Sequence, residues 1–316
     1  MRFRFRPWHL AVALVLVVLA AVGLVEWRRS RLYDASRLMQ TLPVDGAVKV
    51  YIDVQQLRKG GLLESLAGPK AAEDPDYRHF AEQIGFDYRT DLDAVAAVFV
   101  HGDFYAAVQG HFDWKRLADY AESQHGTCIN GLCSLSSDQP DRKISFYLLA
   151  DNVLALAISD SPQGAGMVEP SNGKKGITVP SAAFWISAPG TDFKGLKNAP
   201  TGTQAFLTPL ATAREASFSV QAGSVQGGSP AGNKTFEIRM DVACASPDSA
   251  AALAKVFSST TDLLRRLIVG QGSAPKRTDL TAVLVSGRFE THESSVTGFW
   301  PMDRRVIESL VSDQMK

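Results

Sequence analysis

An apolar run near the start of the chain constrains its fold more than any other feature. The run begins at Leu10, ends at Val25, and contains no charged side chain in sixteen residues. Trp8 and Trp27 stand on either side of it. A helix of about 20 residues, rising 1.5 Å per residue, is about 30 Å long and matches a bilayer core. Indole rings are favoured at the two lipid–water interfaces. The sequence therefore predicts a tail over residues 1–9 and a transmembrane signal anchor over 10–27, with the lipid bilayer as a partner.

A cleaved signal peptide is the alternative to a retained anchor. Ala21 and Gly23 form a small-x-small pattern of the kind found at cleavage sites. Three arginines directly after the run disfavour export of a newly cut end, so retention is the preferred interpretation. Three arginines also precede the run, and the positive charge on its two sides does not decide the orientation.

Two cysteines give the orientation instead. Cys128 and Cys133 flank Asn130-Gly131, the pair typical of a type I′ hairpin turn. Counting outward from this turn places the two cysteines opposite each other, within reach of a disulfide. Free thiols remain the main alternative, because two ligands are too few for a zinc site. A disulfide needs an oxidising compartment, so we expect a single-pass protein of the cytoplasmic (inner) membrane with an extracytoplasmic C-terminal domain.

The composition of the chain indicates how many cores it can form and which partners it does not attract. The chain has 316 residues, 45% of them hydrophobic, with 33 basic and 33 acidic side chains. This length and apolar content suffice for one large or two modest cores. A balanced charge offers no general attraction for nucleic acid, which we exclude as a partner.

Beyond the anchor, short strands alternate with helices and indicate an α+β fold. We expect a juxtamembrane stalk over 28–42, a first α+β unit with hairpins over 43–160, a linker or loop over 161–180, and a second α+β unit over 181–316. Asp113 is expected to cap a helix over 114–123, and Ser246-Pro247-Asp248 to open a long one. Residues 281–285 alternate like a strand.

The two units share a pattern at a shift of 188 residues. Residues 48–54 and 236–242 both follow an apolar alternation that ends in Asp-Val. The same shift carries Asp91-Leu92 onto Asp279-Leu280. The prediction is an internal repeat of two similar β-α-β-β-α units, with an antiparallel meander between them.

No catalytic, cofactor or metal motif stands out. The sequence contains no G-x-S-x-G, no P-loop and no HExxH. His101-x-Asp103 and His111-x-Asp113 lie at opposite ends of one expected strand, about 30 Å apart, which disfavours a shared metal. Asp53 and Asp241 each follow a strand and are interpreted as helix caps; only if the units faced each other could they act together. No cofactor is expected.

The sequence therefore favours a membrane-anchored, extracytoplasmic binding or structural protein of the bacterial cell envelope, holding an envelope protein partner. One-span proteins with a split βαβ domain resemble assembly proteins of bacterial secretion and pilus systems, although no motif here identifies such a family. The alternatives are a hydrolase-type enzyme with a site between the two units, and a cleaved, soluble periplasmic protein.

Overall fold

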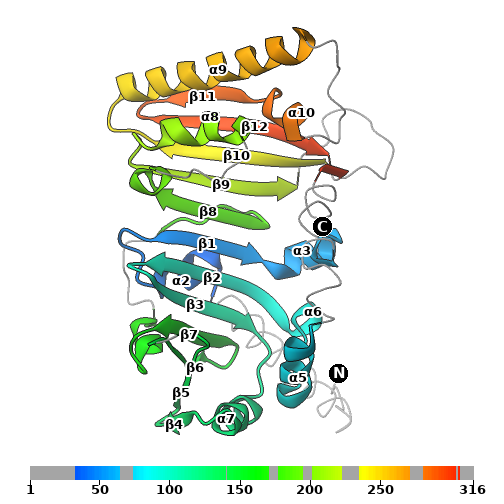
Figure 1. Ribbon diagram of the computed structural model, residues 1–316, viewed down its shortest axis with the longest axis vertical. Coiled ribbons are helices and arrows are strands. Elements are labelled where there is room, and N and C mark those ends of the chain that lie inside the picture. Colours follow the sequence, from blue (N-terminus) through cyan, green and yellow to red (C-terminus); the bar gives the residue numbers. More distant parts are fainter. Residues whose placement is uncertain are drawn as a thin grey trace, which may run out of the picture.

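The computed structural model describes residues 33–64, 74–139, 141–170, 177–194, 201–222, 235–270, 280–303 and 305–306. Within these residues, strands from both halves of the chain form one antiparallel sheet that runs the length of the molecule (Figure 1). The sheet has twelve strands in the order β11-β12-β10-β9-β8-β1-β2-β3-β7-β6-β5-β4. The predicted α+β class holds as a mixed fold with a large antiparallel sheet and helices.

The first half comprises α2 and β1–β7 with the helices between them. Its elements are α2 (Ala35–Gln40), β1 (Val48–Asp53), α3 (Val54–Gly60), α5 (Pro75–Ile84), α6 (Tyr88–Asp91), β2 (Leu92–Val100), β3 (Asp103–Gly110), α7 (Trp114–Ser123), β4 (Thr127–Ile129), β5 (Leu132–Ser136), β6 (Lys143–Ala150), β7 (Val153–Ser159) and the 3-10 turn η1 (Gly164–Met167).

The second half begins at β8, which pairs with β1 in the middle of the sheet. Its elements are β8 (Phe184–Pro189), the 3-10 turn η2 (Gly190–Phe193), α8 (Thr201–Leu210), β9 (Glu215–Ala222), β10 (Thr235–Ala243), α9 (Pro247–Gly270), α10 (Leu280–Leu284), β11 (Arg288–His292) and β12 (Ser295–Asp303).

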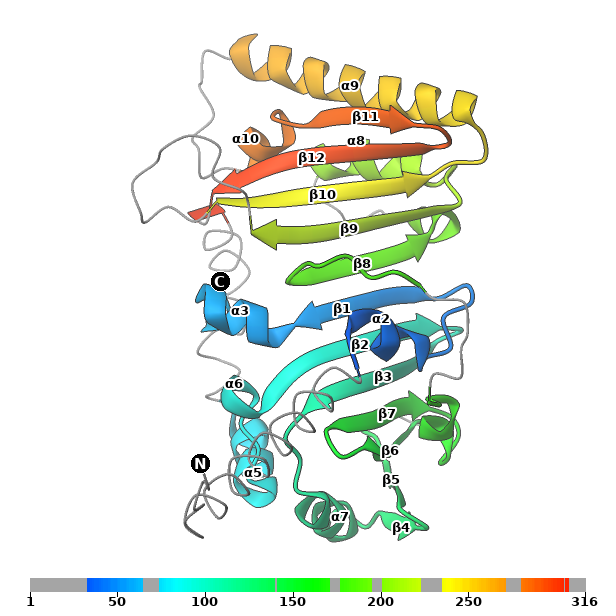
Figure 2. The same cartoon turned by 180° about the vertical axis from the view of Figure 1, so that it is seen from behind.

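The two halves repeat one strand order. In the first half the sheet runs β1-β2-β3-β7-β6 outward from the centre, and in the second it runs β8-β9-β10-β12-β11. Each half has helices between its first and second strands, and helix follows its third strand: α7 in the first half, and α9 and the short α10 in the second. The small hairpin strands β4 and β5 are an insertion after α7. The halves meet at the antiparallel pair β1–β8, which is the arrangement of a twofold repeat (Figure 2).

The repeat differs from the one predicted by the 188-residue shift. That shift overlays β1 on β10. However, β1 pairs with β2, the strand that follows it in the chain, whereas β10 pairs with β12 and not with β11, the strand that follows it. The structure instead matches β1 with β8 and β3 with β10. The predicted register of the repeat is therefore wrong, because a shared Asp-Val at a strand end does not determine which strands pair.

Local signals in the sequence produce the elements they predict at several points. Asp113 accepts a hydrogen bond from the Arg116 backbone and caps α7, and the Ser246 hydroxyl accepts one from the Ser249 backbone at the start of α9. Residues 281–285 are an exception: they overlap helix α10 and form no strand.

The cysteine hairpin has the predicted form. Asn130 and Gly131 both have positive φ, 51° and 79°, as a type I′ turn requires. Cys128 and Cys133 are direct partners on β4 and β5, 4.0 Å apart at their Cα atoms, and are joined by a disulfide. Cys133 is fully buried, so the bridge ties the edge hairpin to the core beneath α7.

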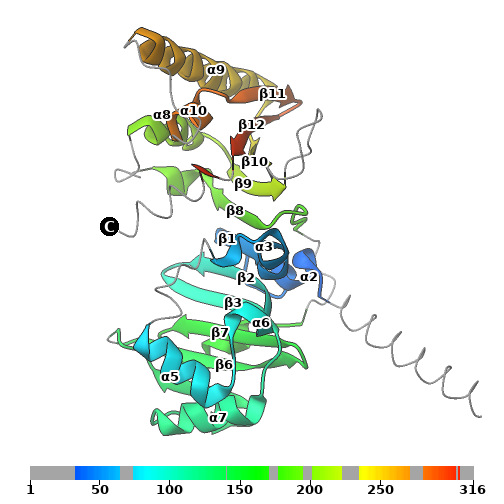
Figure 3. The ribbon, with the colours of Figure 1, turned by 90° about the vertical axis from the view of Figure 1, so that its right-hand side faces the viewer.

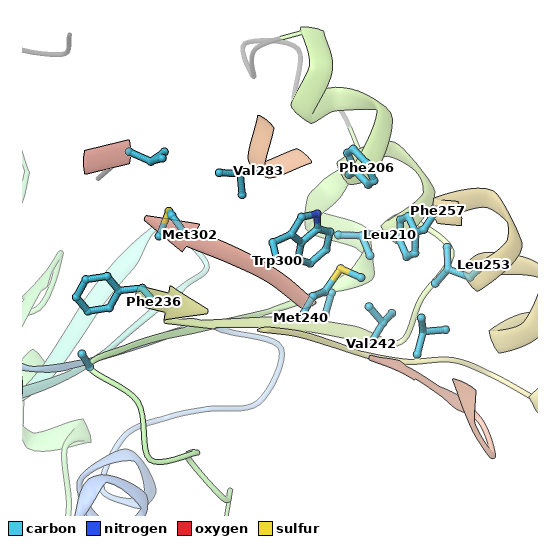
Figure 4. Close-up of a cluster of buried hydrophobic side chains, with 14 of the residues drawn as sticks. Phe206, Leu210, Phe236, Met240, Val242, Leu253, Phe257, Val283, Trp300 and Met302 are labelled. Atoms are coloured by element: carbon cyan, nitrogen blue, oxygen red, sulfur yellow. The ribbon is translucent and has the colours of Figure 1, made fainter. Parts of the chain in front are cut away.

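Helices cover the two faces of the sheet unequally. Helices α5 and α7 lie on one face of the first half and α2 on its other face (Figure 3). The buried residues agree, with α5 and α7 in one core and α2 and η1 in the other. In the second half, α8, α9 and α10 pack on the face that also carries α5 and α7. Figure 4 shows this second core, where the Trp300 ring lies edge-on to Phe206 with centroids 6.1 Å apart.

The predicted location is contradicted. Among the described residues, no helix combines the length and the apolar character that a membrane crossing needs. The prediction of a single-pass protein of the cytoplasmic membrane is corrected accordingly. Its four anchor residues, Trp8, Leu10, Val25 and Trp27, lie outside the described residues.

The expected stalk and the expected linker both contain residues that the structure describes, and these residues pack against the sheet. In α2, expected to be part of the stalk, Leu38 and Met39 are fully buried. In the segment expected to be a linker or loop, Ala165 is fully buried and its backbone N–H donates to the Ser145 hydroxyl at 2.9 Å. Both segments contribute to one core with β1, β2, β3 and β7.

Candidate functional site: an open polar face of the sheet

The two aspartates considered as catalytic partners are far apart. Asp53 accepts a hydrogen bond from the Gln56 backbone at 2.7 Å and caps α3, as expected. Asp241 caps no helix; it accepts hydrogen bonds from Arg239 and Thr297 on the sheet. Strands β8 and β9 lie between β1 and β10. With about 4.8 Å between strands and 3.3 Å per residue, the two carboxylates are about 20 Å apart. They do not form one site.

The two H-x-D triplets also remain separate. Asp103 binds Arg142 and the Tyr105 hydroxyl at the β2–β3 turn, and Asp113 caps α7 beyond the other end of β3. Across the described residues, no group of three or more metal-ligating side chains comes together.

A surface pocket of about 370 Å³ lies beside α5 and α6. It contains neither Asp53 nor Asp241, and it lies within the first half. Its acid Asp87 holds Arg89 through bonds of 2.6–3.0 Å, and the side-chain hydrogen bond from Arg89 lowers the pKa of that carboxyl. Its remaining lining is Tyr77, Arg78, Ala81, Glu82, Gly85, Phe86 and Asp91. The residues of this lining include no histidine, cysteine or serine.

A second candidate site is formed by side chains from the five strands of the second half. Directly paired residues in an antiparallel sheet project from the same face. Reading across β8, β9, β10, β12 and β11 gives one row of Ser187, Ser217, Asp241, Thr297 and Glu290. The neighbouring row on the same face contains Ser219, Arg239, Phe299 and Arg288. We call these nine residues the polar face.

The polar face is the side of the second half on which no described helix packs. The helices of this half bury the other face, around Met240, Val242 and Trp300. In the first half, the corresponding side is covered by α2 and η1. At the β1–β8 pair the same sheet thus passes from an apolar surface covered by α2 and η1 to a polar one on which no described helix packs. Three of the nine residues of the polar face, Ser187, Ser219 and Thr297, are buried.

Arg239 and Asp241 hold each other in place at the centre of the polar face. Two guanidinium nitrogens of Arg239 donate to Asp241 at 2.8 and 2.9 Å, and the Thr297 hydroxyl donates to the same carboxylate at 3.1 Å. The guanidinium also lies 5.6 Å from the centroid of the Phe299 ring, within cation–π range. The Asp241 hydrogen bond raises the pKa of Arg239. Both side chains remain about 40% exposed, at 42% and 41%.

An ion pair between a buried lysine and a half-exposed glutamate marks the boundary between the two halves. Lys49 of β1 is buried and lies 2.8 Å from the Glu215 carboxylate of β9, which also accepts a hydrogen bond from the Ser187 hydroxyl. Burial acts to raise the pKa of Glu215, but the hydrogen bonds from Lys49 and Ser187 outweigh it, so the pKa is lowered. This pair fixes three strands across the point where the polar face begins.

The arrangement is suited to recognition more than to chemistry. Arginine and aromatic side chains are enriched at protein interfaces, and side chains already held in place lose less entropy on binding. A flat sheet face offers no enclosed space that would exclude water from a reaction. The sequence did not predict this site, because its residues come from five strands. The alternation of polar and apolar residues along β9 and β10 was visible, but not which face would lie open.

Comparisons with known proteins give no family. No protein-family model matches the chain, and no curated protein matches it. Among solved structures, crystal form I of TP0453 gives a TM-score of 0.46 at 8% identity, covering 90% of this chain and 100% of that one. Crystal form IV of TP0453 gives 0.44 at 9% identity, covering 89% and 98%. No functional conclusion follows from likenesses this weak.

Proposed function

We infer that the protein is a non-catalytic binding or structural protein, and that the polar face binds a partner protein. The observation that carries this proposal is the Arg239–Asp241 pair, which is about 40% exposed and pre-organised beside Phe299 on the side of the sheet where no described helix packs. The acids Asp241 and Glu290 lie in one row of the face and the arginines 239 and 288 in the neighbouring row, so a partner with a mixed polar surface would complement it better than a strongly charged polymer. Membrane attachment is not part of this proposal.

The enzyme alternative receives less support. An enzyme of this kind would need a pocket between the two halves that contains Asp53, Asp241 or a histidine. The two aspartates are about 20 Å apart by strand geometry, and the pocket beside α5 and α6 contains neither.

Site-specific crosslinking tests the proposal. A photoreactive phenylalanine would replace Ser217 on the polar face, and in a matched protein it would replace Glu122, which is exposed on α7 in the other half. Crosslinking in cells of the source organism, followed by mass spectrometry, should give one discrete adduct from position 217 and none from 122.

A second variant tests whether the positive charge of Arg239 contributes to binding. Arg239→Glu reverses the central charge and should reduce the adduct at position 217 at least tenfold, since a charge facing a like charge across an interface is strongly unfavourable. Circular dichroism confirms that the variant is folded. Equal adducts from positions 217 and 122, or an adduct unaffected by Arg239→Glu, would rule out the polar face as the binding surface.

A further inference from the structure

Strand β4 forms one edge of the sheet and buries little of its own surface. It comprises Thr127–Ile129 and lies at the end of the sheet, where β5 is its only partner among the described strands. Thr127 and Ile129 are both exposed, Ile129 at 68%. Cys128 is partly buried and packs against the core beneath α7. The one side chain that β4 contributes to this core is therefore a cysteine of the disulfide.

The chain is held firmly on both sides of this strand. Before β4, the Gly126 N–H donates to the Ala121 carbonyl at 2.8 Å. A Cβ added at Gly126 would lie 2.7 Å from the carbonyl oxygens of both Ala121 and Ser134, so the backbone is closely packed there. After the turn, Cys133 is fully buried on β5, which pairs with β6. Residues 127–131, which we call the flap, thus lie between two fixed points.

The backbone of β5 bonds to its two neighbours in alternation. In a hairpin with a two-residue turn, the residues that flank the turn form a hydrogen-bonded pair, here Ile129 and Leu132. Leu132 and Ser134 therefore direct their N–H and C=O groups toward β4. Cys133 and Leu135 direct theirs toward β6. If the flap moves away, only Leu132 and Ser134 lose their backbone partners.

The disulfide limits how far the flap can move. It joins Cys128, in the flap, to Cys133, which is fixed in the core. A cross-link in so short a loop reduces the number of open conformations of the flap. The chain-entropy model for such a loop corresponds to a factor of about 30 in the opening equilibrium.

We propose that the Cys128–Cys133 bridge is a redox-sensitive lock: its reduction by a small dithiol lets the flap open and uncovers the edge of β5, while the rest of the sheet stays folded. The proposal does not depend on binding at the polar face, because β4 and β5 lie at the other end of the sheet from β11.

The reduction proceeds by two thiol–disulfide exchanges. One thiolate of the dithiol attacks the sulfur of Cys128, the less buried residue of the two, and the electron pair of the broken S–S bond goes to the Cys133 sulfur, which takes up a proton. The second thiolate then attacks the mixed disulfide and releases Cys128, which also becomes a thiol. The protein gains two electrons and two protons, and the dithiol is oxidised to a disulfide.

Residue-resolved hydrogen exchange of the full chain tests the lock, measured by NMR with and without dithiothreitol. Reduction should accelerate exchange of the Leu132 and Ser134 amides about 30-fold. The Cys133 and Leu135 amides on the same strand are the internal control, and their exchange should not change. Unchanged exchange at Leu132 and Ser134, or equal acceleration of all four amides, would overturn the proposal.

A variant separates loss of the bridge from other effects of the reagent. Cys128→Ala/Cys133→Ala should show the fast exchange at Leu132 and Ser134 without dithiothreitol, and the reagent should not change it further. A variant that still responds to dithiothreitol would show that the bridge is not the lock.

Alkylation of the unmodified chain provides an independent readout. After reduction, iodoacetamide reaches the buried Cys133 when the flap opens. The free Cys244 is 4% exposed in the core of the second half and is reached only when that core opens. Cys133 should be labelled at least tenfold faster than Cys244. Equal labelling rates would show that both thiols wait for global unfolding, which contradicts a local opening.

Discussion

Glu215 shows how one carboxylate can hold the two halves of the sheet together. Its partner Lys49 is buried, so removing the carboxylate leaves an ammonium without its counter-charge. Because the Glu215 side chain is 44% exposed, the cost is discounted from that of a fully buried pair, to about 1–2 kcal/mol for Glu215→Gln. Urea unfolding at pH 7 measures this loss. Glu122→Gln, on the exposed side of α7, should change stability by less than about 0.5 kcal/mol.

The same pair makes stability depend on pH in a defined direction. The folded pKa of Glu215 is lowered, so between the folded and unfolded values the unfolded chain binds more protons and stability rises with pH. The contribution is complete above the unfolded pKa of about 4.3 and is lost as the pH falls through the folded value. The stability difference between wild type and Glu215→Gln should therefore shrink below about pH 4. A difference that stays constant to pH 3 would show that Glu215 titrates as in the unfolded chain.

The Cys128–Cys133 bridge is a second contribution that can be removed alone. It closes a short loop, and the chain-entropy model assigns such a loop about 2 kcal/mol. The double variant Cys128→Ala/Cys133→Ala should lose about this much stability in urea. Reductant should then destabilise the wild type but not the variant. If reductant affects both equally, the effect comes from elsewhere in the chain.

Among the elements, the turn η2 lies close to the end of α8 at Gly190. A Cβ added at Gly190 would lie 2.0 Å from the Ala213 carbonyl oxygen, and backbone atoms cannot move away cheaply. Gly190→Ala should thus separate the end of β8 from the end of α8 and cost at least about 2 kcal/mol. Gly166→Ala is the matched control, since nothing lies within 4 Å of its added Cβ. Thermal unfolding compares the two; similar melting temperatures would contradict the close approach at Gly190.

The elements also show what the sequence could predict. The helix caps at Asp53 and Asp113 and the Asn130-Gly131 turn depend on neighbours within a few residues, and there the predictions hold. The cap predicted at Asp241 was wrong, because this residue lies within β10 and binds Arg239 instead. The strand predicted over residues 281–285 was wrong, because a short apolar stretch fits a buried helix as well as a strand. Packing against β12 decides between the two structures. The order of strands depends on contacts between distant residues, so the 188-residue register was wrong although a repeat exists. The polar face could not be predicted for the same reason.

In the whole molecule, the two repeated halves are joined by one strand pair, yet their cores interlock. Trp185 of β8 is buried in the core of the first half, and Leu57 and Leu62 next to β1 are buried in the core of the second. Each half therefore exposes apolar surface if the other unfolds. The two halves should unfold in a single transition, and hydrogen exchange in increasing urea should give β3 and β10 the same free energy of opening.

Two tryptophan variants separate this coupling from ordinary core stability. Trp185→Ala and Trp300→Ala each remove a side chain that is 5% exposed, at a cost of about 3–5 kcal/mol. Trp300 lies in the core of the second half away from the junction, so its loss should lower the stability of β3 and β10 together. Trp185 lies at the junction, so its loss should let β10 and β3 open at different urea concentrations. If the halves of the wild type already open independently, the β1–β8 pair joins them without coupling them, and the repeat behaves as two domains on one sheet.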